Sequence, residues 1–172
     1  REGLECPPRR NIELFAAYAK DLVELRAVDA ILITCSTMNR SYQYVREAVE
    51  EYGVPVITID QPMMESAVNI GGKILIIATH GPTVNSTQKL LEKTAASMGK
   101  ANSLEYLGAT VEEAFELLGE GKIDEHNELI ADTIREVQAK ERLDVVILAQ
   151  LSMSIFKLSY PNPEHSFGVP VL

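Results

Sequence analysis

The chain has 172 residues, of which 46% are hydrophobic, and its formal net charge is −9. This length suits one ordinary domain or two small ones, and the composition is that of a soluble globular protein. The negative charge argues against a nucleic-acid partner or an anionic membrane, and no apolar run is long enough to span a bilayer.

The cysteines and histidines limit the chemistry further. Two cysteines are too few for a disulfide framework, and no Cys/His cluster has the spacing of zinc ligands, so we expect no metal. The low cysteine count and the lack of a signal-peptide pattern favour a reducing cytoplasm. The chain begins at Arg1 without methionine and ends in an apolar strand pattern at Leu172, so we expect it to be part of a longer protein.

The first predicted element is an amphipathic helix over residues 11–26, where apolar residues recur at helical spacing. An apolar run at 28–33 follows and suits a parallel strand that is covered on both faces. It leads into a polar turn at 34–39, which contains Cys35 and opens the next helix. In open α/β folds, ligands bind beyond the carboxyl ends of strands, where helix N-termini converge. Cys35 is therefore predicted at a ligand-binding position.

Strands and helices continue to alternate along the rest of the chain, which predicts a parallel α/β fold. The pattern predicts strands at 54–59, 73–78, 103–107 and up to about Gln150, and helices at 41–52, 60–70, 88–98, 111–118 and 123–140. Gly71 and Gly72 break the chain between two of these elements. They mark the expected boundary between a first α/β unit, residues 1–70, and a second, residues 71–172.

The turn around Cys35 recurs in weaker form around Gln150. An offset of 115 residues relates Asp29 to Asp144 (144 − 29 = 115). The same offset joins Met38 with Met153, and the Gly-Val-Pro-Val sequence at 53–56 with that at 168–171. We therefore predict two pseudo-symmetric α/β units, each a parallel sheet with helices on both faces. By this offset, Gln150 in the second unit is the residue equivalent to Cys35 in the first (35 + 115 = 150).

Cys35 is the candidate catalytic residue. It is predicted in a turn between a strand and a helix, where peptide dipoles favour a thiolate. The same amides and the hydroxyls of Ser36 and Thr37 would hold a carboxylate. The alternative is an inert, buried cysteine, but the hydroxyl cluster and the repeat favour a function. Cys6 lies before two prolines with no polar cluster, and we interpret it as a residue without a role.

A second polar turn follows the strand at 73–78. Its hydroxyls at Thr79, Thr83, Ser86 and Thr87 could bind a carboxylate or phosphate together with backbone amides, whereas Thr83 alone could be a helix cap. Capping explains one hydroxyl and not four, so binding is favoured. The spacing matches neither glycine-rich nucleotide motif, so no nucleotide cofactor is expected.

Four other polar residues are weaker candidates. His80 could act as an acid or base, but a loop histidine without a visible partner more often has no role in catalysis. We expect His126 on a polar helix face and His165 in a loop, both in contact with solvent. Asp60 is either a helix cap or a site carboxylate, and we favour the cap.

The turn Thr34-Cys35-Ser36-Thr37, the turn at 79–87 and the strand near Gln150 resemble the aspartate/glutamate/hydantoin racemase superfamily, over about residues 11–172. The resemblance implies two similar α/β domains with the active site between them. It implies one cysteine from each domain: one thiolate removes the α-proton of a small carboxylate substrate and the other thiol returns one, without a cofactor. By the resemblance, the first cysteine is Cys35 and the carboxylate-binding hydroxyls are those of Ser36, Thr37, Thr79 and Thr83.

The family's second cysteine corresponds to Gln150. A primary amide donates and accepts hydrogen bonds but is not a useful acid or base, so Cys35 and Gln150 cannot act as a symmetric pair. One-thiol chemistry remains: covalent attack, as the family's maleate isomerases suggest, or one-sided protonation, as its arylmalonate decarboxylases suggest. We predict a racemase- or isomerase-type enzyme that acts through Cys35, with Gln150 among the substrate-binding residues.

Two other functions are open from the sequence. One is a non-catalytic module that binds a small carboxylate and lost its two-base chemistry when position 150 became glutamine. The other is an α/β scaffold whose exposed helices form a homo-oligomer. Deuterium exchange into a ligand would exclude the binding module, and a measurable effect of replacing Cys35 would exclude the scaffold.

Overall fold

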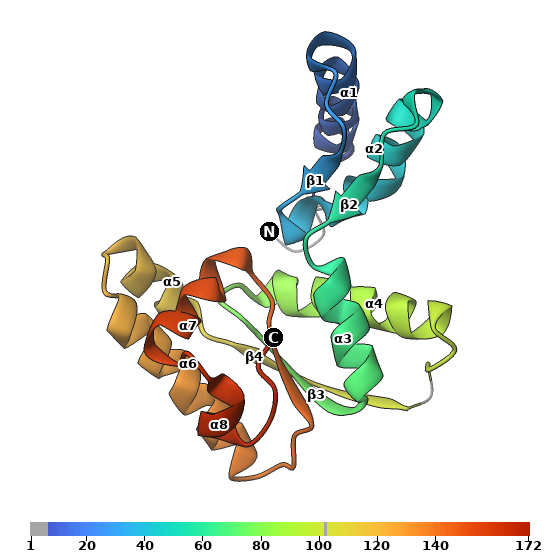
Figure 1. Ribbon diagram of the computed structural model, residues 1–172. Coiled ribbons are helices and arrows are strands. Elements are labelled where there is room, and N and C mark those ends of the chain that lie inside the picture. Colours follow the sequence, from blue (N-terminus) through green and yellow to red (C-terminus); the bar gives the residue numbers. More distant parts are fainter. Residues whose placement is uncertain (1–6, 102) are drawn as a thin grey trace. The chain divides into compact units, whose positions relative to one another are not determined.

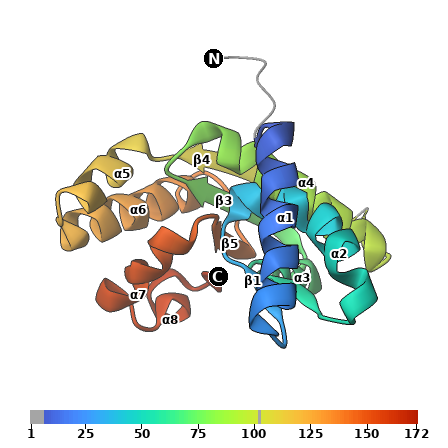
Figure 2. The same cartoon turned by 90° about the horizontal axis from the view of Figure 1, so that it is seen from above.

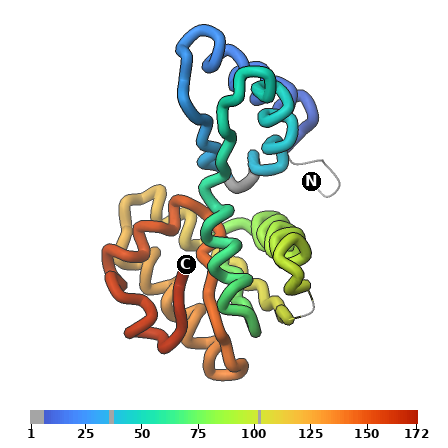
Figure 3. Tube along the Cα trace, turned by 45° about the vertical axis from the view of Figure 1, so that its right-hand side comes forward, coloured from blue at the N-terminus to red at the C-terminus, as the bar shows by residue number. Residues whose placement is uncertain are grey.

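The computed structural model describes residues 7–101 and 103–172, without the side chains of residues 36 and 37. These residues form two compact units, one ending at Gln61 and the other running from Pro62 to Leu172. Strands and helices alternate in both, and all described strand pairs are parallel (Figure 1). The predicted α/β class is therefore confirmed. The trace in Figure 3 passes once from the first unit into the second.

The first unit places helices against a two-stranded sheet. Its elements are α1 (Arg9–Arg26), β1 (Ile31–Ile33), the 3-10 helix η1 (Ser36–Ser41), α2 (Tyr42–Val49), the 3-10 helix η2 (Glu50–Tyr52) and β2 (Val56–Thr58). Side chains of β1 alternate between the core and solvent, because Ile31 and Ile33 are buried while Leu32 is 55% exposed. The prediction of a strand at 28–33 that is covered on both faces is therefore wrong for this unit. The core combines residues from α1, α2 and both strands: Ala19, Val23, Ile31, Ile33, Val45, Val49 and Val56.

The second unit is built on a larger parallel sheet. Its elements are α3 (Gln61–Ile70, of which Gln61 belongs to the first unit), β3 (Gly72–Ala78), α4 (Gly81–Ser97), β4 (Leu104–Thr110), α5 (Glu112–Gly119), α6 (Ile123–Gln138), β5 (Val145–Leu148), the 3-10 helix η3 (Leu151–Ile155), α7 (Phe156–Ser159) and α8 (Pro163–Phe167). The strand order is β4-β3-β5, and Val171 adds a parallel bridge to Val146 on the other edge of β5. Strand β3 is therefore central, and all five residues from Ile74 to Ala78 are fully buried.

Helices cover both faces of this sheet, as the sequence predicted for a continuous apolar strand. On one face, α3 and α4 contribute Met64, Ala67, Val68, Val84, Leu91 and Ala95 to a cluster with β3 and β5. On the other face, α5 to α8 and η3 contribute Ala114, Ile130, Ala131, Ile134, Met153, Phe156 and Phe167. Figure 2 shows α5 and α6 on the opposite side of the strands from α4. The unit is thus a three-layer α/β sandwich.

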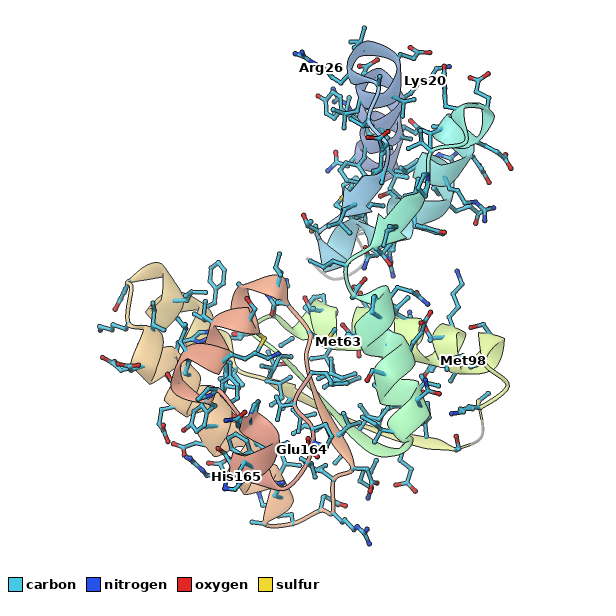
Figure 4. All side chains as sticks on the ribbon, in the orientation of Figure 1. Lys20, Arg26, Met63, Met98, Glu164 and His165 are labelled. Atoms are coloured by element: carbon cyan, nitrogen blue, oxygen red, sulfur yellow. The ribbon has the colours of Figure 1, made fainter. Side chains whose placement is uncertain are left out.

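Helix α3 packs within the second unit from Pro62 onward, so the compact units divide between Gln61 and Pro62 and not at the expected position after residue 70. The reason is burial: Met64 is 1% exposed and packs against the sheet with the cluster on the α4 side. Figure 4 labels Met63 on α3 and Met98 after α4, and both pack against that same cluster. Met64 is thus a core residue, and Met63 and Met98 pack against the core.

Several element boundaries differ from the prediction, and two of the differences affect the region around the second polar turn. Helix α4 begins at Gly81 and not at Gln88, with His80 as its extended N-cap residue and Pro82 in the first turn, where a missing N–H is tolerated. Strand β4 continues to Thr110, beyond the predicted end at residue 107. Within it, a Cβ on Gly108 would lie 2.6 Å from Cγ1 of Val84, so the glycine permits close packing of α4 against β4.

Equivalent backbone geometry occurs in the two units at the offset of 115 residues. The Ile31 N–H donates to the Pro55 carbonyl at 2.9 Å, and the Val146 N–H donates to the Pro170 carbonyl at 2.9 Å. The parallel pairs Ile31–Val56 and Val146–Val171, and the positive-φ residues Gly53 and Gly168, obey the same offset. The similarity of the two units therefore extends to individual hydrogen bonds.

Candidate active site

In the first unit, Cys35 lies just beyond the carboxyl end of β1. Its backbone is extended, with φ −112° and ψ 115°, and its carbonyl accepts the Met38 N–H at 2.9 Å to start η1. Its side chain is a free thiol and is exposed. The expectation of burial in the alternative interpretation is therefore wrong, and the thiol is accessible to solvent.

The turn after Cys35 differs from the predicted α-helical N-terminus. The residues from Ser36 to Ser41 form a 3-10 helix, and the α-helix α2 begins only at Tyr42. Peptide dipoles in such a short 3-10 segment are fewer and less well aligned, so the dipole argument for a thiolate is weaker than expected. The side chains of Ser36 and Thr37 lie outside the described part of the chain, as does Cys6.

A buried carboxyl group lies near this turn. Asp60, two residues beyond β2, is 5% exposed and accepts a hydrogen bond from the side-chain amide of Asn39 in η1. Burial raises the pKa of Asp60, against the lowering effect of hydrogen bonds from its own backbone, Asn39 and Thr58. Asp60 thus joins the end of β2 to the turn after Cys35, a contact that the sequence did not reveal.

In the second unit, Thr79 and Gln150 meet beyond the carboxyl ends of β3 and β5. The Oε1 atom of Gln150 accepts the Thr79 N–H at 2.6 Å and the Thr79 hydroxyl at 2.9 Å. Gln150 is also the extended N-cap residue of η3, with φ −140° and ψ 137°, and its carbonyl accepts the Met153 N–H at 2.9 Å. The structure therefore brings together two of the predicted site residues of this unit.

The remaining hydroxyls of the second polar turn lie at different positions along helix α4. Thr83 is half-buried in the first turn, where its N–H donates to the His80 carbonyl at 3.0 Å, so it is not the N-cap residue. Ser86 donates to the Pro82 carbonyl at 3.0 Å, and Thr87 is 5% exposed. The polar turn predicted at 79–87 is therefore shorter than expected, because Ser86 and Thr87 belong to the interior of α4.

Sequence reasoning missed Thr110. This exposed residue ends β4, is paired with Ala78 of β3, and has its Oγ1 3.9 Å from the position of a Cβ on Gly81. It therefore lies at the same sheet edge as Thr79, beside the start of α4. The prediction ended this strand at residue 107 and so placed Thr110 elsewhere. The helical periodicity that begins after residue 110 was the available signal for a longer strand.

His80 follows Thr79 directly at this edge, whereas His126 and His165 lie on helices α6 and α8. His126 on α6 is fully buried, contrary to prediction, with Nδ1 2.8 Å from Oδ1 of Asn127 and with Nε2 unpaired. Asn127 in turn donates to the Ile155 carbonyl at 3.0 Å and to the Ser159 hydroxyl at 2.8 Å, which fixes α6 to η3 and α7. His165 is exposed, as predicted, but lies on α8 and not in a loop (Figure 4). His80 is exposed as well. His126 was misplaced because its burial depends on distant residues.

The described part of the chain contains neither a candidate metal site nor a candidate membrane span. Over residues 7–101 and 103–172, no group of three or more histidine, cysteine or acidic residues could hold a metal ion. Within the same part of the chain, none of the helices combines the length and the apolar character needed to cross a bilayer.

Comparison with known proteins gives a family and several similar folds. The sequence model of the family described as Asp/Glu/Hydantoin racemase matches residues 7–172. No curated protein matches the chain. A glutamate racemase from Campylobacter jejuni subsp. jejuni has 19% identity and a TM-score of 0.56, over 92% of this chain and 60% of its own.

Two further solved structures have similar folds. The glutamate racemase isoform RacE1 from Bacillus anthracis has 16% identity and a TM-score of 0.63, over 99% of this chain and 63% of its own. An allantoin racemase from Klebsiella pneumoniae has 15% identity and a TM-score of 0.61, over 94% of this chain and 60% of its own. At such identities the likeness concerns the fold, and the chain spans about three-fifths of the length of these proteins.

Proposed function

The chain belongs to the Asp/Glu/hydantoin racemase family, and from this premise we propose that it is a racemase- or isomerase-type enzyme that acts on a small carboxylate without a cofactor. We assign the chemistry to the thiol of Cys35. We assign the binding of the substrate to Ser36, Thr37, Thr79, Thr83 and Gln150. Internal duplication of one α/β unit would explain why the strand ends that carry Cys35 and Gln150 are equivalent.

The observation that carries the proposal is the exposed thiol of Cys35 at a strand end. Ligands of parallel α/β folds bind at such ends, and an exposed thiol is able to reach a bound substrate. The fold neighbours include two glutamate racemases and an allantoin racemase, which supports racemase-type chemistry.

The proposed reaction begins when the Cys35 thiolate takes the proton from the carbon next to the carboxylate. The electron pair of the broken C–H bond moves into the carboxylate, which becomes an enediolate. The Cys35 thiol then returns a proton and re-forms the C–H bond on the same face, whereas a proton from water on the other face gives the opposite configuration. Gln150 cannot deliver that second proton because an amide is not a useful acid. Exchange with retention should therefore be faster than inversion.

A single thiol also permits two related reactions. Protonation of the enediolate that remains after loss of carbon dioxide would make the protein a decarboxylase. Addition of the thiolate to a double bond, rotation and elimination would make it a cis-trans isomerase. The amide at position 150 also favours a non-catalytic candidate, a protein that binds a small carboxylate without turning it over.

Alkylation of the full chain tests the proposal. Iodoacetamide should label Cys35 faster than Cys6, and a small dicarboxylate should slow the labelling of Cys35 alone. Mass spectrometry of the peptides measures both rates in one sample, so Cys6 is the internal control. Equal rates at the two cysteines, or no protection of Cys35 by any carboxylate tried, would contradict the proposal. A cytoplasmic location and a homo-oligomer remain predictions from the sequence.

A further inference from the structure

The contact between Thr79 and Gln150 follows from the register of the central sheet. Ile77 of β3 is paired with Leu148 of β5, so Thr79 and Gln150 face each other two residues later. The last backbone bond between these chain segments joins the Ala149 N–H to the Ile77 carbonyl at 2.9 Å. Beyond it, the Thr79 N–H donates to the side chain of Gln150.

The chemistry of the donors fixes the orientation of this amide. A backbone N–H can only donate, so the amide atom 2.6 Å from the Thr79 nitrogen has to be the oxygen and not the nitrogen of Gln150. The Thr79 hydroxyl adds a second donor to the same oxygen at 2.9 Å. Thr79 is only 4% exposed, so water cannot readily replace Gln150 as the acceptor for these two groups.

Among the described residues, the opposite end of the amide has no such partner. Gln150 is half-buried, and the hydrogen bonds among the described residues include none from its Nε2 atom. Because both acceptor positions of the oxygen are occupied by Thr79, Gln150 can offer a ligand only its two N–H groups. Gln150 lies two residues beyond the end of β5, and Thr79, which holds it, lies two residues before the start of α4.

We propose that Thr79 is a positioning residue that holds the Gln150 amide as a pure hydrogen-bond donor to a carboxylate oxygen of the ligand. This inference rests on the proposed function, because it takes the ligand to be a small carboxylate at this strand end. It reassigns Thr79, whose hydroxyl serves Gln150 and not the ligand. It also gives position 150 a role in selecting anionic ligands, in place of proton transfer.

Nitrogen-15 spectra of the full chain test this assignment with sodium succinate as the probe. The side-chain amide signals of Gln150 are identified by their loss in Gln150→Met. We expect succinate to shift these signals in the wild type and in Thr79→Ser, which keeps the hydroxyl. Thr79→Val has a similar shape without the hydroxyl, and it should weaken succinate binding about 3- to 10-fold, the effect of one ordinary hydrogen bond.

Gln150→Glu is the sharpest variant. Its carboxylate can still accept both Thr79 donors, so the fold should remain, but its second oxygen would meet the succinate carboxylate with a like charge. We expect binding to weaken about 10- to 100-fold, which corresponds to a lost hydrogen bond to a charged group. The same spectra report whether each variant stays folded. Succinate binding by Gln150→Glu or Thr79→Val at wild-type affinity would overturn the proposal. It would also be overturned if the Gln150 signals of the wild type did not respond to succinate at any concentration at which the protein stays folded.

The outcome can be separated from that of the proposed enzyme activity. If succinate shifts the Gln150 signals as expected but Cys35 is neither protected nor required for turnover, the donor role stands and the enzyme proposal fails. If turnover requires Cys35 but responds to neither Thr79→Val nor Gln150→Glu, the enzyme proposal stands and the donor role fails.

Discussion

The turns that follow β1 and β5 have similar backbone conformations but differ in the chemistry of their side chains. Cys35 and Gln150 are both extended residues that precede a 3-10 helix, and each carbonyl accepts the N–H of a methionine three positions later at 2.9 Å. The thiol is exposed, whereas the amide oxygen is bonded twice by Thr79. The comparison teaches that equivalent strand ends of the two units present different functional groups, a thiol open to solvent and an amide whose oxygen is already bonded.

The surroundings of the two turns differ as well. Asn39, in the first turn, donates to the buried carboxyl group of Asp60. The residue at the equivalent place in the second turn is Ser154 (39 + 115 = 154), which is exposed. The first turn is therefore anchored through a carboxyl group next to its 3-10 helix, and the second is anchored through its own N-cap side chain.

The largest expected effect comes from removing the thiol. Cys35→Ser should lower turnover of a substrate about 10²- to 10⁴-fold, because the hydroxyl of serine is a far weaker proton acceptor than a thiolate. Cys6→Ser is the matched control and should keep wild-type turnover. The measurement is the initial rate with each purified variant, after circular dichroism has shown equal folding. Comparable rates for Cys35→Ser and Cys6→Ser would contradict the assignment of proton transfer to Cys35. The chemical difference between the turns after β1 and β5 would then have no effect on turnover.

A smaller effect is expected from the anchors of the two turns. Asn39→Ala should lower the free energy of unfolding by about 1–3 kcal/mol, because the buried carboxyl group of Asp60 loses a hydrogen-bond donor. Ser154→Ala, at the equivalent exposed position, should change it by less than about 0.5 kcal/mol. Urea titration followed by circular dichroism measures both. Equal losses would show that Asn39 anchors its turn no more strongly than the exposed Ser154 at the equivalent position.

The pH dependence of stability tests Asp60 itself. Burial raises the pKa of its carboxyl group, so the folded protein holds this proton more tightly than the unfolded chain does. The contribution of Asp60 to the free energy of unfolding should therefore be greatest in acid. It should decline as the pH rises from the ordinary range of aspartate through the raised value. Asp60→Asn cannot titrate, and its stability should fall less steeply over that window, as urea titration at a series of pH values would measure. Parallel pH profiles would contradict the assignment.

The smallest effect concerns the hydroxyls of helix α4. Thr83→Ala should raise the half-saturating substrate concentration about 2- to 10-fold if its hydroxyl contacts the carboxylate, which is the effect of one hydrogen bond. Ser86→Ala is the control, since the Ser86 hydroxyl already donates to the Pro82 carbonyl at 3.0 Å. Steady-state kinetics separate the two. Identical values for Thr83→Ala and the wild type would exclude Thr83 from binding.

Periodicity and spacing in the sequence predicted most of the fold. The parallel strands and the strand-end positions of Cys35 and Gln150 follow from apolar runs and from the offset of 115 residues. The polar stretch after β3 is predicted as a turn that precedes a helix at 88–98, but most of it forms the first turns of α4, because hydroxyl residues and Pro82 are compatible with a helix start. Local composition does not separate these two structures.

The contacts that define the candidate site could not be predicted from the sequence. The bond between Thr79 and Gln150 joins residues 71 positions apart, and that between Asn39 and Asp60 joins residues 21 positions apart. Both depend on strand register, which a single sequence specifies only through buried patterns. The burial of His126 depends in the same way on segments far along the chain.

The most direct test of one thiol without a second acid is the fate of the α-proton in heavy water. Amino acids, hydantoins and small diacids are incubated with the full-length protein, and NMR follows deuterium in the recovered substrate and in its mirror image. The account predicts that deuterium enters the recovered substrate faster than inversion occurs, and that Cys35→Ser abolishes this exchange. Deuterium found at first only in the inverted product would demonstrate a second proton donor and contradict the account.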